Sequence, residues 1–312
     1  MVSFFFSNLS IAQTQSSIKI PIILNFDHYH SMETITAWFQ VLEQNSNLVK
    51  TNIIGFSQEK RPIIAIKIAS PISNQSKKSI FINATHHGNE RSATESALGF
   101  IQKIIQEQQE AQIQKILQSF NIYVIPILNP DGFIHQSRFD AKGRDLNRNY
   151  PINHKGKIEP RIVLPEIKSI MKFMTRVHFF GAIALHSGMK GILWPWCHKS
   201  NENRQQGMFH WLAKRFAKRM DFTYYTQSWQ DYATQGEFID YAYQTFGTIA
   251  LTVEVSEEHT PPVEELNATV IKSVNSMVEF LSDLLNIDNL NKLPTNTPYQ
   301  QSSPAKDSPE AA

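Results

Sequence analysis

The chain has 312 residues, of which 41% are hydrophobic, and this suits one large domain with a sizeable core. Its 30 basic and 28 acidic residues give a formal net charge of +2, which argues against the basic surface typical of nucleic-acid-binding or membrane-surface proteins. The single cysteine, Cys197, excludes an internal disulfide framework, and no apolar run reaches the length of about 18 residues that a membrane span needs.

The two ends of the chain differ in composition from the region between them. Residues 1–17 contain a short apolar stretch with Ala12 near its end, but lack the basic segment that starts a standard signal peptide. Two interpretations stay open: a signal-peptide remnant, which would favour a secreted or periplasmic location over the cytoplasm, and a frayed N-terminus. Residues 287–312 are rich in polar residues and proline, which predicts a disordered tail. The domain itself is expected over residues 18–286.

The apolar residues between these ends alternate between helical and strand patterns. Ile35, Trp38 and Leu42 recur at helical spacing, whereas residues 80–82 and 122–128 form short apolar runs typical of buried strands. In chain order we predict a helix over residues 32–42, strands over 53–55, 63–68 and 80–82, a helix from about residue 92, a strand over 122–128, a helix over 165–174, a strand over 179–185, helices around 209–220 and over 238–246, a strand over 248–255 and a helix over 263–285. Strands that alternate with helices predict an α/β fold, a three-layer α/β/α arrangement around a central mixed, largely parallel sheet.

Two connections between the predicted elements stand out. Residues 129–132, Asn-Pro-Asp-Gly, predict a turn directly after a strand. The long loop that follows contains Arg138, Arg144 and Arg148, and a second loop covers residues 229–236. Loops of this length inside a compact domain usually carry function.

Five residues that can do chemistry end a predicted strand or follow one: His87, Arg138, Arg148, His186 and Glu254. In sheets of this kind ligands bind beyond the carboxyl ends of the strands. These side chains are therefore candidates for a single site.

The turn after the strand at residues 80–82 presents His87 and Glu90, three residues apart. Catalytic zinc usually takes three ligands from His and carboxylate side chains and keeps a fourth position for water, so this pair suits a hydrolytic metal site. His86 stays open as the alternative to His87, because it lies four residues before Glu90. The His-x-x-Glu pattern is common by chance, so the rest of the chain has to supply the remaining parts.

Seven segments, in the order of the chain, resemble motifs of the zinc carboxypeptidase family, the carboxypeptidase A-like peptidases. They are residues 54–62 (Ile-Gly-Phe-Ser-Gln-Glu-Lys-Arg-Pro), 87–90, 129–132, 145–149, 185–187, 232–240 and 252–254. The resemblance extends from about Tyr29 to Glu254. It implies the fold predicted above and a zinc-dependent metallocarboxypeptidase, with one zinc ion per chain, that hydrolyses the C-terminal peptide bond of peptides.

The resemblance also implies the metal ligands. It selects His87 rather than His86, together with Glu90 and His186, as the three zinc ligands. It matches Asp145 with a carboxylate outside the ligand set, whose role would be to accept the second ring N–H of His87 and so fix its tautomer. A loop aspartate that only caps a turn is the alternative for Asp145.

Two further matches carry the implied chemistry. Glu254 resembles the general base that takes a proton from the zinc-bound water and later passes it to the leaving amine. Arg138 resembles the arginine that stabilises the oxyanion formed from the scissile carbonyl. Arg144 is the alternative residue for this role. The alternative to a catalytic role is that Arg138 belongs to a solvated basic loop.

The remaining matches concern the substrate. Asn147 and Arg148 resemble the pair that holds the terminal carboxylate, since a planar guanidinium offers two parallel donors to a carboxylate. Tyr232 resembles a mobile tyrosine that caps the bound substrate from a loop. Ile239 falls at the base of the family's side-chain pocket, where an apolar residue would suit an aliphatic or aromatic terminal residue.

Substrate preference stays open at this stage. Asp231 and Glu237 lie in the same stretch as Ile239, and either could attract a basic or amino-bearing side chain. The expected partner is a peptide with a free C-terminal carboxylate, with no nucleic acid and no membrane span. Two alternatives remain: a bacterial cell-wall peptide hydrolase of the same fold that cuts before diaminopimelate, and a catalytically silent peptide-binding protein.

Overall fold

The computed structural model describes residues 23–71, 76–152, 162–201 and 203–287. The interpretations of residues 1–17, and the tail prediction for residues 288–312, concern residues outside these ranges. Ile287, which we assigned to the tail, is instead buried in the hydrophobic core. Within the described ranges, none of the helices combines the length and apolarity that crossing a bilayer requires.

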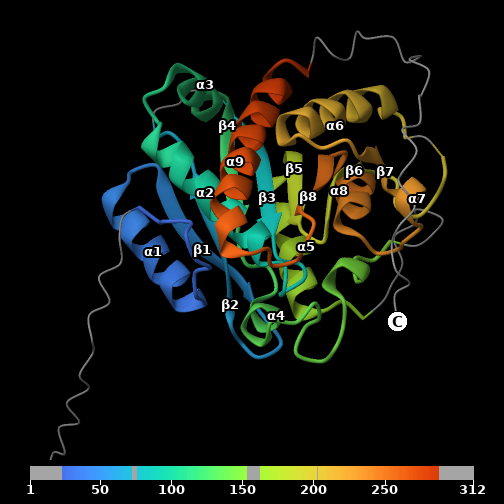
Figure 1. Ribbon diagram of the computed structural model, residues 1–312, viewed down its shortest axis with the longest axis horizontal. Helices are drawn as coiled ribbons and strands as arrows, with labels where there is room; N and C mark the ends of the chain where they lie inside the picture. Colours follow the sequence, from blue (N-terminus) through green and yellow to red (C-terminus); the bar gives the residue numbers. More distant parts are fainter. Residues whose placement is uncertain (1–22, 72–75, 153–161, 202, 288–312) are drawn as a thin grey trace, which may run out of the picture.

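The described residues form a central sheet with helices on both faces (Figure 1). Its strands, in spatial order, are β1 (Val49–Phe56), β2 (Pro62–Ile68), β4 (Phe120–Ile125), β3 (Lys78–Ala84), β5 (Phe179–His186), β8 (Ile249–Ser256), β6 (Met189–Trp194) and β7 (Tyr225–Gln227). The β4–β3, β3–β5, β5–β8 and β6–β7 pairs are parallel, and the other three pairs are antiparallel. The predicted mixed, largely parallel sheet is thus confirmed.

The helices divide between the two faces of the sheet. They are α1 (Met32–Asn45), α2 (Arg91–Gln106), α3 (Ala111–Ser119), α4 (Pro130–His135), α5 (Pro165–Val177), α6 (Gln206–Met220), α7 (Ser228–Asp231), α8 (Phe238–Phe246) and α9 (Val263–Leu285), with a 3₁₀ turn at Leu146–Arg148. Buried residues of α1, α2, α3, α6 and α9 join one core cluster, and those of α5 and α8 join a second. Strand β3 contributes Ile80 and Ile82 to the first cluster and Phe81 to the second, as expected for alternating side chains.

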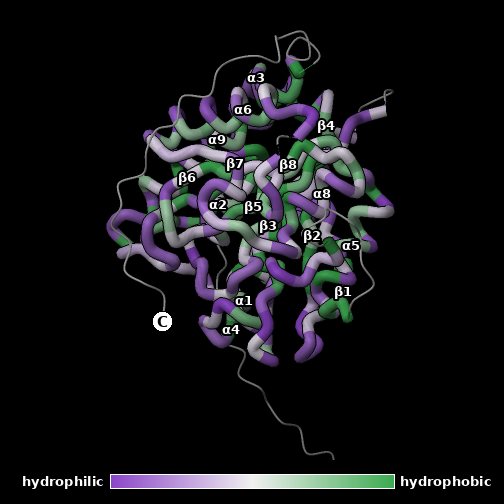
Figure 2. The backbone as a smooth tube through the Cα atoms, turned by 90° about the vertical axis from the view of Figure 1, so that its right-hand side faces the viewer, coloured by the Kyte–Doolittle hydropathy of each residue, from purple (hydrophilic) through white to green (hydrophobic). Residues whose placement is uncertain are grey.

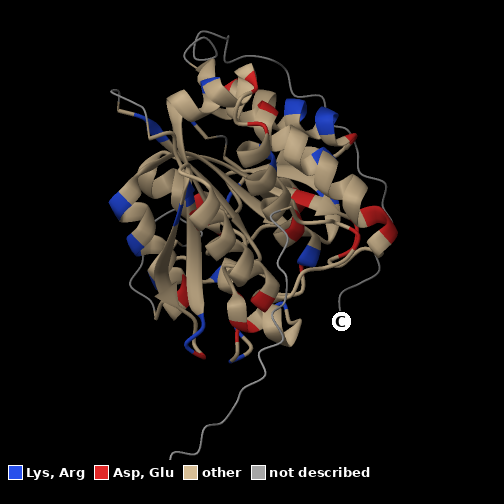
Figure 3. Cartoon of the chain, turned by 90° about the vertical axis from the view of Figure 1, so that its left-hand side faces the viewer, with Lys and Arg blue, Asp and Glu red and all other residues tan. Residues whose placement is uncertain are grey.

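Hydropathy and charge follow this layered arrangement. Hydrophobic residues are concentrated in the strands at the centre of the molecule (Figure 2). Basic and acidic residues are interspersed around the outside of the part of the chain that Figure 3 colours. This distribution agrees with the near-zero net charge of the whole sequence.

Several predicted elements differ from the structure. Residues 129–132 do not form a turn: Asn129 caps α4, its side chain accepting the Gly132 N–H at 2.9 Å, and Pro130 occupies the first turn, where its missing N–H costs little. The preceding strand ends at Ile125, because Pro126 offers no N–H to a neighbouring strand. Helix α3, strands β6 and β7, and the short helix α7 within the 229–236 loop are not predicted from the sequence patterns.

The loop after β3 is fixed by close contact with the start of α4. A Cβ atom on Gly88 would lie 1.9 Å from the carbonyl carbon of Gly132, so the two backbones approach as only glycine allows. The Asn129 side chain also donates to the His86 carbonyl at 3.1 Å, and the Asn129 N–H donates to the Thr85 carbonyl at 3.0 Å. These contacts hold the segment that carries His87 at the carboxyl end of the sheet.

Candidate metal centre and active site

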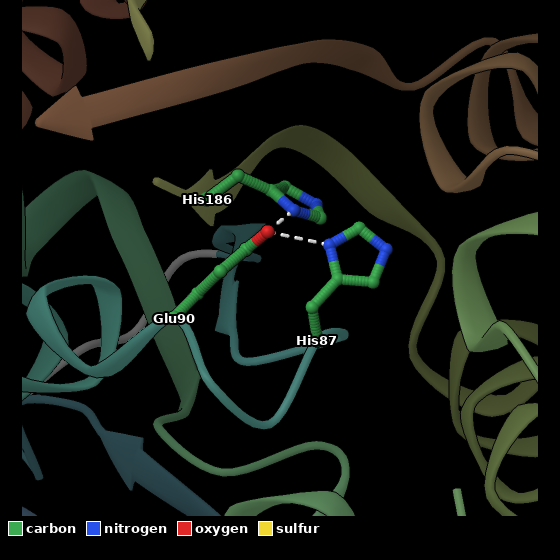
Figure 4. A group of neighbouring side chains, drawn as sticks. All are labelled: His87, Glu90 and His186. Carbon is green, nitrogen blue, oxygen red and sulfur yellow. Dashed lines mark hydrogen bonds and ion pairs between the residues drawn. The ribbon is translucent and has the colours of Figure 1, made fainter. Parts of the chain in front are cut away.

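Three of the sequence-predicted residues converge at the carboxyl ends of β3 and β5. The two strands are parallel neighbours, so His87, just after β3, lies near His186, the last residue of β5, and Glu90 precedes α2 (Figure 4). His87 Nδ1 lies 2.6 Å from one carboxylate oxygen of Glu90, and His186 Nδ1 lies 2.9 Å from the other. All three side chains are buried.

This group fits a zinc ion by its donor chemistry. One donor atom from each of the three residues lies within 4.8 Å of the others, and two imidazoles with one carboxylate form a ligand set that catalytic zinc accepts. Nothing donates to or accepts from the buried Nε2 atom of His186 among the described residues. His86 does not join the group, because its Nε2 contacts the Tyr150 hydroxyl at 2.9 Å and its ring stacks on that of His186.

Burial and the neighbouring carboxylates have opposite effects on the pKa of His87. Burial acts to lower the pKa of His87, but the carboxylates of Glu90 and Asp145 outweigh burial and raise that pKa to about 9. Burial likewise disfavours ionised Glu90 and Asp145, yet the neighbouring imidazoles hold the pKa of both carboxyls far below its usual range. The two carboxylates therefore favour the protonated form of the His87 ring.

This arrangement predicts a pH-dependent zinc affinity. With its pKa raised to about 9, the His87 ring should be mostly protonated at pH 7, and a zinc ion that binds its Nδ1 atom would displace that proton, so the apparent zinc affinity should fall as the pH falls. The expected change is about tenfold per pH unit between pH 9 and pH 7, for one released proton. Competition with a chromophoric chelator at several pH values measures it. An affinity that does not vary over this range would contradict the predicted protonation of His87.

Asp145 connects His87 to Arg138. One carboxylate oxygen lies 3.1 Å from His87 Nε2, and the other accepts from Arg138 Nε at 3.1 Å and Nη2 at 2.8 Å. The first oxygen also accepts the Asn147 N–H at 2.8 Å, which caps the 3₁₀ turn. The competing residue Arg144 instead pairs with Asp140 at 2.5 Å. Asp145 therefore caps a turn and also contacts the His87 imidazole.

A cavity of about 210 Å³ opens beside the group. The sequence-predicted residues that line it are His87, Glu90, Arg138, Asn147, Arg148, His186, Tyr232 and Glu254. Its other lining residues are Ser187, Gly188, Met189, Leu193, Ser228, Glu237, Thr252 and His259. Ile239 does not line the cavity: it is 1% exposed and packs in the second core cluster.

Two of the lining residues that were not predicted, Leu193 and His259, lie in sequence patterns that could have identified them. Leu193 lies on β6, and the apolar residues 192–194 form a short run of the kind that predicts a buried strand. His259 follows β8 by three residues, and a polar residue in a loop after a strand end is a usual site position. Its Nδ1 donates to the Ser187 carbonyl at 2.6 Å, which ties this loop to the end of β5.

Glu254 lies on the strand next to the one that carries His186, beside the candidate zinc ligands. It is paired in register with His186 across β5 and β8, and both line the cavity. Burial, and then the charge of Glu90, raise the pKa of Glu254 well above its usual value. A carboxyl with such a pKa, placed beside a candidate metal, suits proton transfer.

At the other end of the cavity, Arg148 is the centre of a polar cluster. Its Nη2 donates to the Tyr232 hydroxyl at 3.1 Å, and its Nη1 lies 3.3 Å from the Glu237 carboxylate. Asn147 accepts the Phe238 N–H at 3.0 Å through Oδ1, which leaves its Nδ2 hydrogens as the donors that it can offer to a ligand. The cavity thus has the candidate zinc ligands and a carboxyl at one end, and donors suited to an anion at the other.

Comparison with known proteins shows what the chain is similar to. The zinc carboxypeptidase family model matches residues 35–276. Carboxypeptidase O of Bos taurus is 24% identical over 300 residues, which cover 83% of this chain and 80% of that protein. Bovine thrombin-activatable fibrinolysis inhibitor, solved in complex with tick carboxypeptidase inhibitor, has a TM-score of 0.73 at 20% identity over 84% of this chain and 99% of that one. Carboxypeptidase A of Helicoverpa armigera has a TM-score of 0.74 at 19% identity over 83% of this chain and 74% of that one.

Proposed function

Because the chain belongs to the zinc carboxypeptidase family, we propose that it is a zinc-dependent metallocarboxypeptidase that hydrolyses the C-terminal peptide bond of peptides. The supporting observation is that one cavity joins the group His87, Glu90 and His186, the carboxyl of Glu254 and the donors of Arg148. An enzyme that removes a terminal residue needs a metal site, a proton-transfer group and a binding group for the terminal carboxylate in one cavity.

The two histidines and Glu90 would hold one zinc ion. When bound, zinc supplies a Lewis acid that lowers the pKa of a coordinated water towards 7. Asp145 keeps the His87 ring oriented by accepting from its Nε2, which leaves Nδ1 directed at the metal position. Glu254 accepts a proton from the attacking water and returns it to the nitrogen of the leaving residue.

Arg138 is the group that would stabilise negative charge on the scissile carbonyl oxygen. Its guanidinium lines the cavity and is fixed by two hydrogen bonds to Asp145. A donor that is already oriented need not reorganise when charge develops, which is why such groups lower activation barriers.

Asn147, Arg148 and Tyr232 would hold the terminal carboxylate. The guanidinium supplies charge and paired donors, the Asn147 amide adds another donor, and the Tyr232 hydroxyl already contacts Arg148. This cluster supports an exopeptidase, because an internal peptide bond would bring no carboxylate to it. A substrate with an amidated C-terminus should therefore be a poor one.

The direct test compares N-blocked dipeptides with free and amidated C-termini. The zinc-loaded protein should hydrolyse the free acid, and a chelator should lower the rate by at least about 100-fold, since the metal activates the water. Adding zinc back should restore the activity. No hydrolysis by the zinc-loaded protein of any free-acid substrate would favour the alternative, a catalytically silent peptide-binding protein.

A second function, hydrolysis of cell-wall peptides before diaminopimelate, has one observation in its favour. Glu237 places a carboxylate in the cavity, where it could meet the distal amine of such a residue. Peptides that end in diaminopimelate belong in the same substrate panel. A preference for them over peptides ending in lysine would support this alternative.

A further inference from the structure

Glu237 is a buried carboxylate in the cavity that the proposed mechanism does not use. The residue is 6% exposed, immediately precedes α8 and lines the cavity. Its Oε1 lies 3.3 Å from Arg148 Nη1 and also accepts from the Thr234 hydroxyl. Its Oε2 accepts from the Cys197 thiol at 3.3 Å. These contacts fix the carboxylate beside the group that would receive the substrate.

Among the residues that the structure describes, no arginine on the cavity wall has a charge left unpaired for an incoming anion. Of the arginines in the described part of the chain, Arg138 and Arg148 line the cavity, and each already has a carboxylate partner, Asp145 for Arg138 and Glu237 for Arg148. A terminal carboxylate that binds to Arg148 brings a second negative charge to one guanidinium. An uncompensated charge in a buried site is costly, so this end of the cavity needs another cation when the substrate is bound.

We propose that the substrate supplies this cation, and that Glu237 selects peptides whose terminal residue carries an ammonium or guanidinium group. The inference deepens the proposed function and rests on it. The terminal carboxylate and the side-chain cation would together balance Arg148 and Glu237. A terminal residue with an apolar or acidic side chain leaves the second negative charge unpaired.

The positions of the two rival residues support Glu237. Ile239, the position that the family resemblance suggested for the side-chain pocket, lies in the core and does not reach the cavity. Asp231 does not line the cavity and accepts from the Tyr224 hydroxyl at 3.0 Å. Of the acidic residues between positions 231 and 240, Glu237 lines the cavity, and Asp231 and Asp240 do not.

The test uses N-blocked dipeptides that end in lysine, in norleucine or in glutamate. Lysine and norleucine side chains have similar length and differ in charge. The zinc-loaded wild type should favour lysine over norleucine by at least about tenfold in kcat/KM, as expected for a close charge pair. Glu237→Gln should abolish that preference, by lowering kcat/KM for lysine and raising it for norleucine. The matched control Asp231→Asn should keep the wild-type preference.

Two results would overturn the inference. The first is an equal loss on every substrate in Glu237→Gln, which would show that Glu237 only holds Arg148 in place. The second is a change of preference in Asp231→Asn instead. Binding of the same peptides, measured by calorimetry in a Glu254→Gln background, keeps the test valid if Glu237→Gln reduces turnover in general. If the wild type cleaves no substrate, the proposed function fails, while the ratio of lysine to norleucine binding still decides the inference.

Discussion

Replacing Glu254 with glutamine is expected to lower kcat by about 10²- to 10⁴-fold, the range attributed to a general acid–base group. Glutamine keeps the size of the side chain but cannot accept a proton. Because Glu254 is not part of the group His87, Glu90 and His186, the variant should still bind one zinc ion per chain. Turnover of a blocked dipeptide and the metal content of the purified protein are the two measurements.

A matched substitution controls for the loss of a negative charge near the cavity. Glu257 lies three residues further along the chain, is exposed and does not line the cavity. Glu257→Gln should therefore keep wild-type kcat. A Glu254→Gln variant that retains both zinc and wild-type turnover would remove Glu254 from the mechanism.

The second large effect is expected from Arg148→Ala. Breaking a buried charge pair costs about 3–5 kcal/mol, so kcat/KM for a substrate with a free carboxylate should fall by about 10²- to 10⁴-fold. Most of the loss should appear as a higher KM, since the contact exists before the chemical step. Steady-state kinetics on free-acid and amidated substrates measure it, and the amide should show little change.

Removing Arg148 also leaves the Glu237 carboxylate without its cation, and this has to be separated from the loss of substrate contact. The double variant Arg148→Ala with Glu237→Gln removes both charges. If substrate contact is the main cause, the double variant should remain as impaired as the single one. Arg176→Ala, at an exposed position of α5, is the control for lost positive charge. Equal losses on the free acid and the amide would contradict a role in binding the carboxylate.

Much of the fold could be predicted from local patterns. The predicted helices over residues 238–246 and 263–285 coincide with α8 and α9, because each has a clear apolar stripe bounded by turn residues. The alternation of strands and helices was enough to predict a mixed sheet between helices. Strand β7 has three residues, which are too few for a periodic pattern, and β6 begins with the mixed segment Met-Lys-Gly, so that its apolar run is only three residues long.

The candidate site was predictable where it follows from strand order. His87, His186 and Glu254 all stand at or just after the ends of neighbouring parallel strands, so the topology brings them together. The contact between Glu237 and Arg148 could not be predicted, since it depends on how one loop packs on another. The Tyr150 N–H donates to the Gly236 carbonyl at 3.0 Å, and a Cβ atom on Gly236 would lie 2.3 Å from the Arg148 carbonyl oxygen. Such close backbone approach leaves no periodic signal in the sequence.

Asp145 contacts two side chains that have separate roles in the proposed chemistry, His87 at the metal and Arg138 at the carbonyl oxygen. One oxygen holds an imidazole that faces the metal position, and the other holds the guanidinium of Arg138. A shift of this single carboxylate would move both side chains at once, so the free-energy effects of substitutions at His87 and at Arg138 should not simply add. A substitution that moves Asp145 would then change the zinc affinity and the stabilisation of the carbonyl oxygen together, and neither could be altered at this position without the other.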